Sequence, residues 1–231
     1  MSPAPEFAGR ILAGTGFEGD DGSADPVLLR AMQEPDDERA LMERMSAARL
    51  LVPVVAGDRQ REQTSTDMSS VTITAPDGQR ALPAFTSIAV LSAWDPDARP
   101  VPVAAARAAQ AAVAERCEVM IVDLGADVSV VLRPSMVWAL AQQRAWCPAY
   151  EDPFVVTAVR HAAHQEPDVA AVLVEAGEPV GAGVLRIALA LRPGLDARAV
   201  QALVTRVGER IATDGEARGR IDAINFAIRP S

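Results

Sequence analysis

Residues 80–103 read RALPAFTSIAVLSAWDPDARPVPV, and this stretch decides the fold class of the chain. Its first six residues, Arg80–Phe85, are mostly apolar and of strand length, which predicts a strand. Residues 88–94 predict a short helix that ends at Asp95-Pro96, because the residue before a proline disfavours the helical conformation. Residues 99–103 carry two prolines, which lack a backbone N–H, so this segment can pair on only one side of a sheet. A strand, a helix and an edge strand in succession predict an α/β protein.

The residues before this stretch extend the same alternation. Asp25-Pro26 predicts a helix start, since Asp is a common N-cap residue and proline fits the first helical turn. A second helix is expected after residues 35–37. The apolar run Leu50–Val55 predicts a strand, and Pro53 within it predicts an edge or bulge position. The polar segment 57–70 predicts a long hairpin loop.

The residues after it continue the alternation of helices and strands, and a second cycle is expected to begin at Pro153, after a domain boundary at 147–152. The expected elements are a helix at 104–116, a hairpin at 118–132, a helix from Arg133-Pro134 to 143, a helix from Pro153, strands at 169–175 and 184–191, a long helix capped by Asp196, and a strand at 221–228. Composition predicts a flexible lead at 1–24, a domain at 25–148 and a smaller domain at 149–231. The predicted fold class is α/β (α+β-like), with two small mixed-sheet domains and helices packed on the sheets.

Charge and composition exclude several classes of function. The 231 residues carry a formal net charge of -9, so the chain lacks the clustered positive charge with which proteins bind nucleic acid. No apolar run approaches the roughly 20 residues that span a bilayer. Residues 1–14 lack the charged start and the apolar core of a secretion signal. We therefore expect a soluble cytoplasmic protein whose partners include neither nucleic acid nor membrane.

A glycine pattern near the N-terminus does not predict a nucleotide site. Gly14, Gly16 and Gly19 fit G-x-G-x-x-G, but such a site needs a buried strand before the glycines and a helix directly after them. Asp20 and Asp21 follow instead, and their charges would repel a pyrophosphate. We expect no cofactor.

Histidines and cysteines do not predict a metal or a nucleophilic site. His161 and His164 lie three residues apart on a predicted helix, but zinc sites normally need at least three protein ligands, and no third one stands out. Cys117 and Cys147 have no evident base nearby in the sequence. We expect both thiols to behave as small apolar side chains.

Two carboxylates flank a predicted turn. Asp123 and Asp127 could form a general acid/base pair, although Asp at a strand end is more commonly a turn residue. Neither a G-x-S-x-G nor a Walker pattern occurs. The sequence therefore predicts no catalytic residue and favours a protein that is not an enzyme.

The scarce aromatic residues raise a binding hypothesis. Large aromatic side chains usually stabilise a core. The alternative is a shallow groove lined by Trp94 and Trp146. Its rim would hold Arg99 and Arg133, because aromatic residues beside arginine are common at interface hot spots. The binding residues that this hypothesis predicts are Phe85, Trp94, Arg99, Arg133 and Trp146, within an aromatic set that also includes Trp138 and Tyr150.

Several residues in and around the central stretch point to one family. They are ALPAFTS at 81–87, Trp94, RPVPV at 99–103, Arg133, Trp146 and Pro148. In these residues the chain resembles the SseB family, over about Asp25 to Pro148, followed by a smaller C-terminal domain. The resemblance implies family membership and no particular chemistry.

These observations favour a non-catalytic binding or regulatory module, which contacts a protein partner or an acidic small ligand through the surface from Phe85 to Val103. One alternative is an enzyme or a sensor whose carboxylate or amino-acid ligand lies between the domains, clamped by Arg99 and Arg133. Another is a self-associating scaffold in which the proline-containing strands form a dimer edge. The sequence leaves these alternatives open.

Overall fold

The structure, a computed structural model, describes residues 17, 19–34, 36–55, 69–75, 78–179 and 181–230. We term residues up to 146 the N-terminal portion and residues from 147 the C-terminal portion. The N-terminal portion contains α1 (Pro26–Met32), α2 (Glu38–Ser46), β1 (Arg49–Val55), β2 (Ser69–Ser70), β3 (Ile73–Thr74), β4 (Arg80–Ala84), α3 (Ile88–Trp94), β5 (Arg99–Ala104), α4 (Ala105–Ala114), β6 (Val119–Val122), β7 (Val130–Leu132) and α5 (Pro134–Ala141). The C-terminal portion contains α6 (Pro153–His164), β8 (Val169–Ala176), β9 (Val184–Leu191), α7 (Ala197–Thr213), α8 (Gly215–Gly219) and β10 (Ala223–Pro230). These elements confirm the predicted α/β (α+β-like) class.

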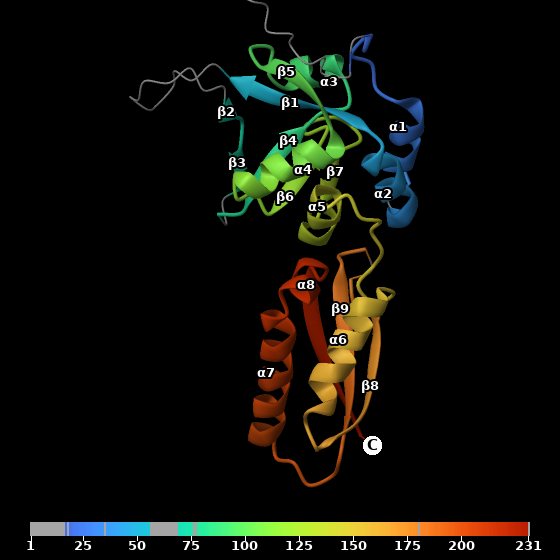
Figure 1. Cartoon of the computed structure of the whole chain (residues 1–231), viewed down its shortest axis with the longest axis vertical. Helices are drawn as coiled ribbons and strands as arrows, with labels where there is room; N and C mark the ends of the chain where they lie inside the picture. The colour runs from blue at the N-terminus through green and yellow to red at the C-terminus, as the bar shows by residue number, and fades with distance from the viewer. Residues whose placement is uncertain are drawn as a thin grey trace, which may run out of the picture.

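The two portions lie end to end, and the segment between α5 and α6 joins them (Figure 1). Each has its own cluster of buried apolar side chains. The larger cluster draws on residues from Leu28 to Leu140, the other on residues from Val155 to Ile211, and they share no residue. The division into domains at 25–148 and 149–231 stays a prediction.

Phe85 connects the two sheets of the N-terminal portion. One sheet has the order β2-β1-β5 with antiparallel neighbours, and the other has the order β3-β4-β6-β7, in which β4 and β6 are parallel. Directly after β4, Phe85 exchanges two backbone hydrogen bonds with Leu51 of β1, with N···O distances of 2.8 and 2.9 Å. The stretch 80–103 therefore begins in one sheet, contacts the other, and ends as an edge strand of that second sheet.

Helices α1, α2, α4 and α5 bury their apolar side chains in the N-terminal core. Asp25 and Asp37 cap α1 and α2 by accepting hydrogen bonds from the backbone N–H groups of Val27 and Ala40 at 2.8 and 3.0 Å. Small side chains let α4 pack closely against its neighbours. The fully buried alanines of α4 are Ala105, Ala108, Ala109 and Ala112.

The prediction for Pro53 is wrong, because β1 is the central strand of its sheet. The carbonyl of Pro53 accepts a hydrogen bond from the N–H of Val71 at 3.2 Å, on the side of β2. In an antiparallel sheet the backbone N and O atoms of one residue face the same neighbouring strand. The side of Pro53 that lacks an N–H therefore also faces β2, and β2 forms only two residue pairs with β1. Pairing with β5 therefore loses no hydrogen bond. The predicted edge position of β5 is confirmed.

The expected lead at 1–24 and the expected loop at 57–70 lie mostly outside the described residues, as do two glycines of the G-x-G-x-x-G pattern. The described end of the lead is held by Arg49. Its guanidinium forms an ion pair with Asp20 at 2.6 Å and donates to the carbonyl of Thr86 at 2.8 Å. The described end of the lead is therefore held against β1 by Arg49, and the flexible lead at 1–24 stays a prediction.

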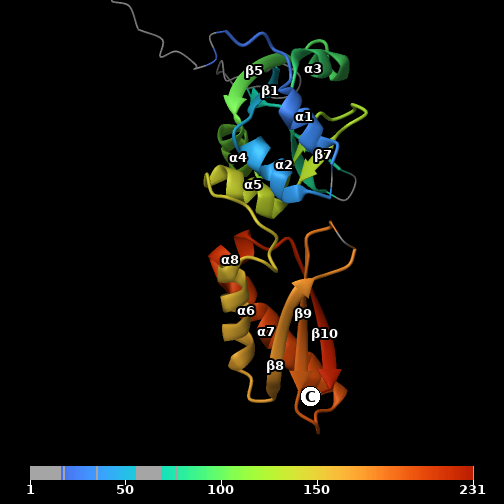
Figure 2. The ribbon, with the colours of Figure 1, turned by 90° about the vertical axis from the view of Figure 1, so that its right-hand side faces the viewer.

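The C-terminal portion is a sheet with α6 and α7 on one face (Figure 2). Its central strand β9 runs parallel to β10 and antiparallel to β8. Asp196 caps α7, as predicted, by accepting from the N–H of Ala199 at 2.7 Å. Like the other helices of the described residues, α7 lacks the combined length and apolar character needed to cross a membrane. The sequence did not predict α8, because five residues are too few to show a helical period.

Candidate functional site

The five residues predicted to bind a partner do not form one groove. Phe85 has a fully buried side chain, packed with Leu51 and Leu91 where the two sheets meet. Trp94 lies against it, with ring centroids 5.2 Å apart. Phe85 therefore stabilises the core and cannot line an open surface.

The other three predicted residues lie elsewhere. Arg99 is exposed at the start of β5, opposite Val54. Arg133 and Trp146 lie together, with the guanidinium carbon 5.8 Å from the ring centroid. Figure 1 shows α3, which ends in Trp94, at the opposite end of the N-terminal portion from α5, which follows Arg133. The predicted groove between Trp94 and Trp146 is therefore wrong, because the fold places the two indoles on different parts of the core.

Arg133 and Trp146 belong to a polar cluster at the junction of the two portions, which we term the Asp222 cluster: Glu38, Arg133, Ser135, Trp146 and Asp222. Asp222 Oδ1 accepts from the backbone N–H of Ser135 at 2.7 Å, and its Oδ2 accepts from the Ser135 hydroxyl at 2.9 Å. Ser135 lies in the first turn of α5, whose N-cap residue Arg133 makes no side-chain capping bond. A carboxylate of the C-terminal portion therefore caps a helix of the N-terminal portion, where the helix dipole favours a negative charge.

Arg133 uses its donors within the protein. Its Nε donates to Asp222 at 2.9 Å, its Nη2 to Glu38 at 3.0 Å, and its Nη1 to Glu38 and to the carbonyl of Gly181. Burial by itself lowers the pKa of Arg133, but the hydrogen bonds to Glu38 and Asp222 outweigh burial and raise the pKa above its ordinary value. The predicted clamp of Arg99 and Arg133 on an external carboxylate is therefore not formed, since internal carboxylates occupy Arg133 and Arg99 lies on β5.

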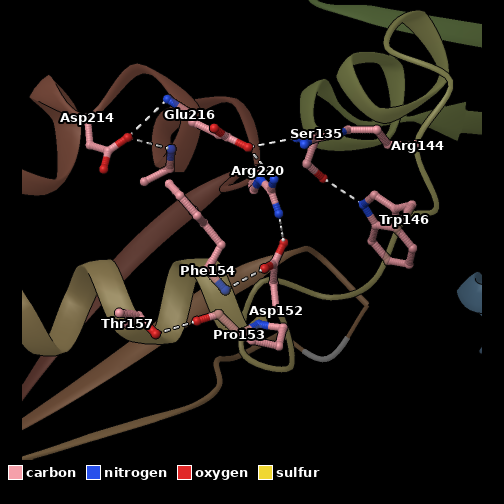
Figure 3. Close-up of polar contacts among 11 residues, drawn as sticks. Ser135, Arg144, Trp146, Asp152, Pro153, Phe154, Thr157, Asp214, Glu216 and Arg220 are labelled. Carbon is pink, nitrogen blue, oxygen red and sulfur yellow. Dashed lines mark hydrogen bonds and ion pairs between the residues drawn. The ribbon is translucent and has the colours of Figure 1, made fainter.

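A second group of charges lies beside the first, and we term it the Arg220 cluster: Arg144, Asp152, Glu216 and Arg220 (Figure 3). Arg220 donates from Nη1 to Asp152 Oδ2 at 2.7 Å and from Nη2 to Glu216. Arg144 donates to the same Glu216 oxygen at 2.7 Å. Asp152 also caps α6, because its Oδ1 accepts from the N–H of Phe154 at 2.8 Å. Charge-assisted hydrogen bonds thus connect α6 and α8 with the segment after α5.

Aromatic rings enclose Arg220, yet one of its donors has no partner. Its guanidinium carbon lies 4.7 Å from the ring centroid of Phe154 and 5.5 Å from that of Trp138, within the range of cation–π attraction. Among the buried side-chain nitrogen and oxygen atoms of the described residues, Arg220 Nε alone makes no hydrogen bond. Buried donors in native proteins are nearly always satisfied. The Nε–H of Arg220 is therefore a buried donor that the described protein atoms leave unsatisfied.

Cavities surround both clusters. One of about 340 Å³ has walls that include Trp138, Arg144, Trp146 and Arg220. Trp146 also lines neighbouring cavities of about 480 and 570 Å³. The smallest of the three has the size of a small-molecule site. The junction therefore combines hollow space, aromatic walls and guanidinium donors.

The cysteines and histidines offer no reactive group at the junction. Cys147 lines the 340 Å³ cavity, but burial raises the pKa of its thiol and the charge of Asp152 raises it further, so the thiol stays protonated near neutral pH. His161 and His164 are exposed in the last turn of α6. In the part of the chain that the structure describes, no three His, Cys, Asp or Glu side chains are placed to hold a metal ion.

Asp123 has a structural role. It is buried directly after β6, at a φ of 57°, and its two oxygens accept from the N–H and the hydroxyl of Thr86, each at 2.7 Å. Burial raises the pKa of Asp123, and the hydrogen bonds from Thr86 offset part of that rise. Asp127 is exposed at the other end of the turn. Asp123 thus fastens the ends of the parallel strands β4 and β6 through Thr86.

Comparison with known proteins identifies the N-terminal portion. Residues 27–139 match the family model of the SseB protein N-terminal domain. This portion belongs to the SseB family. The matched SseB segment runs from α1 into α5, so it supplies Ser135 and Trp138 to the junction. No curated protein and no solved structure shows a match to the chain.

Sequence reasoning missed most residues that build the junction of this SseB protein. Arg220 and Asp222 lie before the last strand, where no local pattern distinguishes a junction residue from a surface residue. The strand expected at 221–228 wrongly includes Asp222, because β10 begins at Ala223. Asp152 does have a signal, because an Asp before Pro153 predicts a helix N-cap. Trp138 is visible as one of few aromatic residues, but its neighbours across the junction are not.

Proposed function

We propose that this SseB-family protein is a non-catalytic binding module that takes a small carboxylate ligand in the 340 Å³ cavity at the junction. The observation that carries the proposal is the pair of guanidinium groups, Arg144 and Arg220, in the wall of that cavity beside Trp138 and Trp146. A carboxylate is a strong acceptor for guanidinium donors, because both groups are charged and their geometries match.

Arg144 adds further donors to the same wall. It donates to Glu216 from Nη1, and its side chain is 52% exposed, so its Nε and Nη2 can reach a second acceptor. Trp138 and Trp146 supply the apolar part of the cavity wall. The arrangement favours a ligand that joins a carboxylate to an apolar body.

The groups around the cavity favour binding over catalysis. Both oxygens of Asp152 already accept hydrogen bonds, from Phe154 and Arg220. The Cys147 thiol stays protonated, and no histidine lines the cavity. A general base or an activated nucleophile would need a titratable group free to exchange a proton with the ligand.

A thermal-shift screen tests the proposal. The panel consists of small carboxylates, including serine and other amino acids, each measured with the wild type, Arg144→Gln and Arg198→Gln. Arg198 is exposed near the start of α7 and serves as the matched control, because it loses the same charge outside the junction. We expect a carboxylate that raises the Tm of the wild type and of Arg198→Gln. Binding to Arg144→Gln should be roughly ten- to a hundred-fold weaker, the cost of one charged hydrogen-bonded contact.

Two results would refute the proposal. One is a panel in which no carboxylate shifts the Tm of the wild type. The other is an equal shift in all three proteins, which would place the ligand outside the junction. Quenching of tryptophan fluorescence by the same ligand provides an independent readout, because Trp138 and Trp146 wall the cavity.

A further inference from the structure

The outer side of β7 forms a groove that the proposed ligand site does not use. In the described residues, β7 pairs with β6 and ends the sheet order β3-β4-β6-β7. A cavity of about 570 Å³ lies between β7 and the α1–α2 connection. Its floor includes Met32, Leu41 and Met136, whose side chains are buried. The groove therefore offers an apolar floor next to an unpaired strand edge.

The edge of β7 is suited to accept another strand. Val131 is 52% exposed, and β-branched residues of this kind favour strand pairing. An unpaired edge presents backbone N–H and C=O groups in a row, and an extended peptide can bind them as an added strand. By contrast, the edge strand β5 carries Pro100 and Pro102, which have no N–H to donate. Of these two edges, β7 is the one with a full set of donors.

The rim of the groove is acidic. Asp36, Glu38 and Asp127 line it. Glu38 is neutralised by its ion pair with Arg133, whereas Asp36 and Asp127 make no ion pair with a described residue. Both are exposed on opposite sides of the groove, one before α2 and the other before β7. Their charges favour a cationic occupant.

We propose that this groove binds an extended, basic segment of a partner protein, which adds to the edge of β7 as a strand. Apolar residues of the segment face Met32 and Met136, and its Lys or Arg residues face Asp36 and Asp127. A second copy of this chain fits the groove poorly, because each copy carries a net charge of -9 and like charges repel.

Fluorescence anisotropy with synthetic peptides tests the proposal. The probe is a labelled eight-residue peptide in which Val and Arg alternate. Two comparison peptides carry Glu in place of Arg, or N-methyl groups on alternate backbone amides so that these amides cannot donate. We expect the wild type to bind the Val–Arg peptide, to bind the N-methylated form more weakly, and not to bind the Glu form.

Protein variants separate the groove from general attraction to an acidic protein. Asp36→Asn with Asp127→Asn should weaken binding roughly two- to thirty-fold, because the double variant loses two exposed ion pairs with the peptide. Asp97→Asn with Glu209→Gln removes the same charge from exposed positions that do not line the groove, and should leave binding unchanged. Thermal melting checks that all variants fold.

Three outcomes would overturn the proposal. If both double variants weaken binding equally, the attraction is nonspecific. If the N-methylated peptide binds as well as the parent peptide, no strand is added to β7. If the Val–Arg peptide does not bind at low salt, the groove does not take a basic segment.

Discussion

Two glycines between β8 and β9 provide a matched test of the Asp222 cluster. Gly181 and Gly183 have φ values of 81° and 72°, a region in which a side chain costs roughly 1–2 kcal/mol. A Cβ on Gly181 would meet no described atom within 4 Å. A Cβ on Gly183 would lie 2.5 Å from both Arg133 Nε and Asp222 Oδ2. Gly181→Ala therefore adds backbone strain alone, whereas Gly183→Ala also displaces the Arg133–Asp222 ion pair.

The expected difference between the two variants follows from the burial of that ion pair. The side chains of Arg133 and Asp222 are 16% and 8% exposed, so solvent screens their interaction little. The loss of one charged hydrogen bond costs about 1.5–3 kcal/mol. In a chain of this length 1 kcal/mol shifts the Tm by about 2–4 °C, so Gly183→Ala should melt roughly 3–12 °C below Gly181→Ala.

Calorimetry is the appropriate assay, because it measures the Tm and also shows whether the two portions, which have separate apolar clusters, unfold together. Tryptophan fluorescence during urea unfolding gives a second measure, since Trp146 lies beside Arg133. Equal stability of Gly181→Ala and Gly183→Ala would refute the reasoning. It would mean that the Arg133–Asp222 contact contributes nothing to the fold in solution.

Three further predictions concern buried groups. Hydrogen bonds from Arg206 and Arg210 lower the pKa of Glu166 in the folded protein below its unfolded value of about 4.3. The contacts of the Glu166 carboxylate with these two arginines therefore stabilise the fold above that pH, and this stabilisation is lost as the pH falls. Glu166→Gln should therefore unfold with a shallower acid dependence than the wild type, and parallel curves would contradict this. Asp123→Ala should lower the free energy of unfolding in urea by about 2–4 kcal/mol, because it leaves two buried donors of Thr86 unpaired. Asp123→Asn should lower it less, and the reverse order of the two variants would disprove the assigned role of Asp123. Phe85→Ala should cost about 3–5 kcal/mol as a core truncation, and a cost under about 1 kcal/mol would show that Phe85 is not in the core.

The local elements of this chain could be predicted because their causes are local. The helix starts at Asp25-Pro26 and at Asp196 depend on side chains that cap N–H groups two or three residues away. The edge position of β5 follows from its two prolines, which cannot donate to a second neighbour. The SseB resemblance rests on the same stretch, and the family match over residues 27–139 confirms it.

The error at Pro53 has an instructive cause. A proline inside an apolar run usually indicates an edge strand. Here the partner on the affected side is the two-residue strand β2, so a proline is tolerated in a central strand. The rule about hydrogen bonds held, but the sequence did not show how short the neighbouring strand would be.

The sequence by itself determined the fold class, the order of nearly all helices and strands, the edge position of β5 and the SseB family. Only the tertiary structure decided that Phe85 is buried between two sheets, that Trp94 and Trp146 lie apart, and that Asp222 caps α5 from 87 positions along the chain. Hydrophobic period, capping and proline act over a few residues, so they can be read along the chain. The junction is built by contacts between distant segments, and these arise when each apolar face finds the partner that buries it.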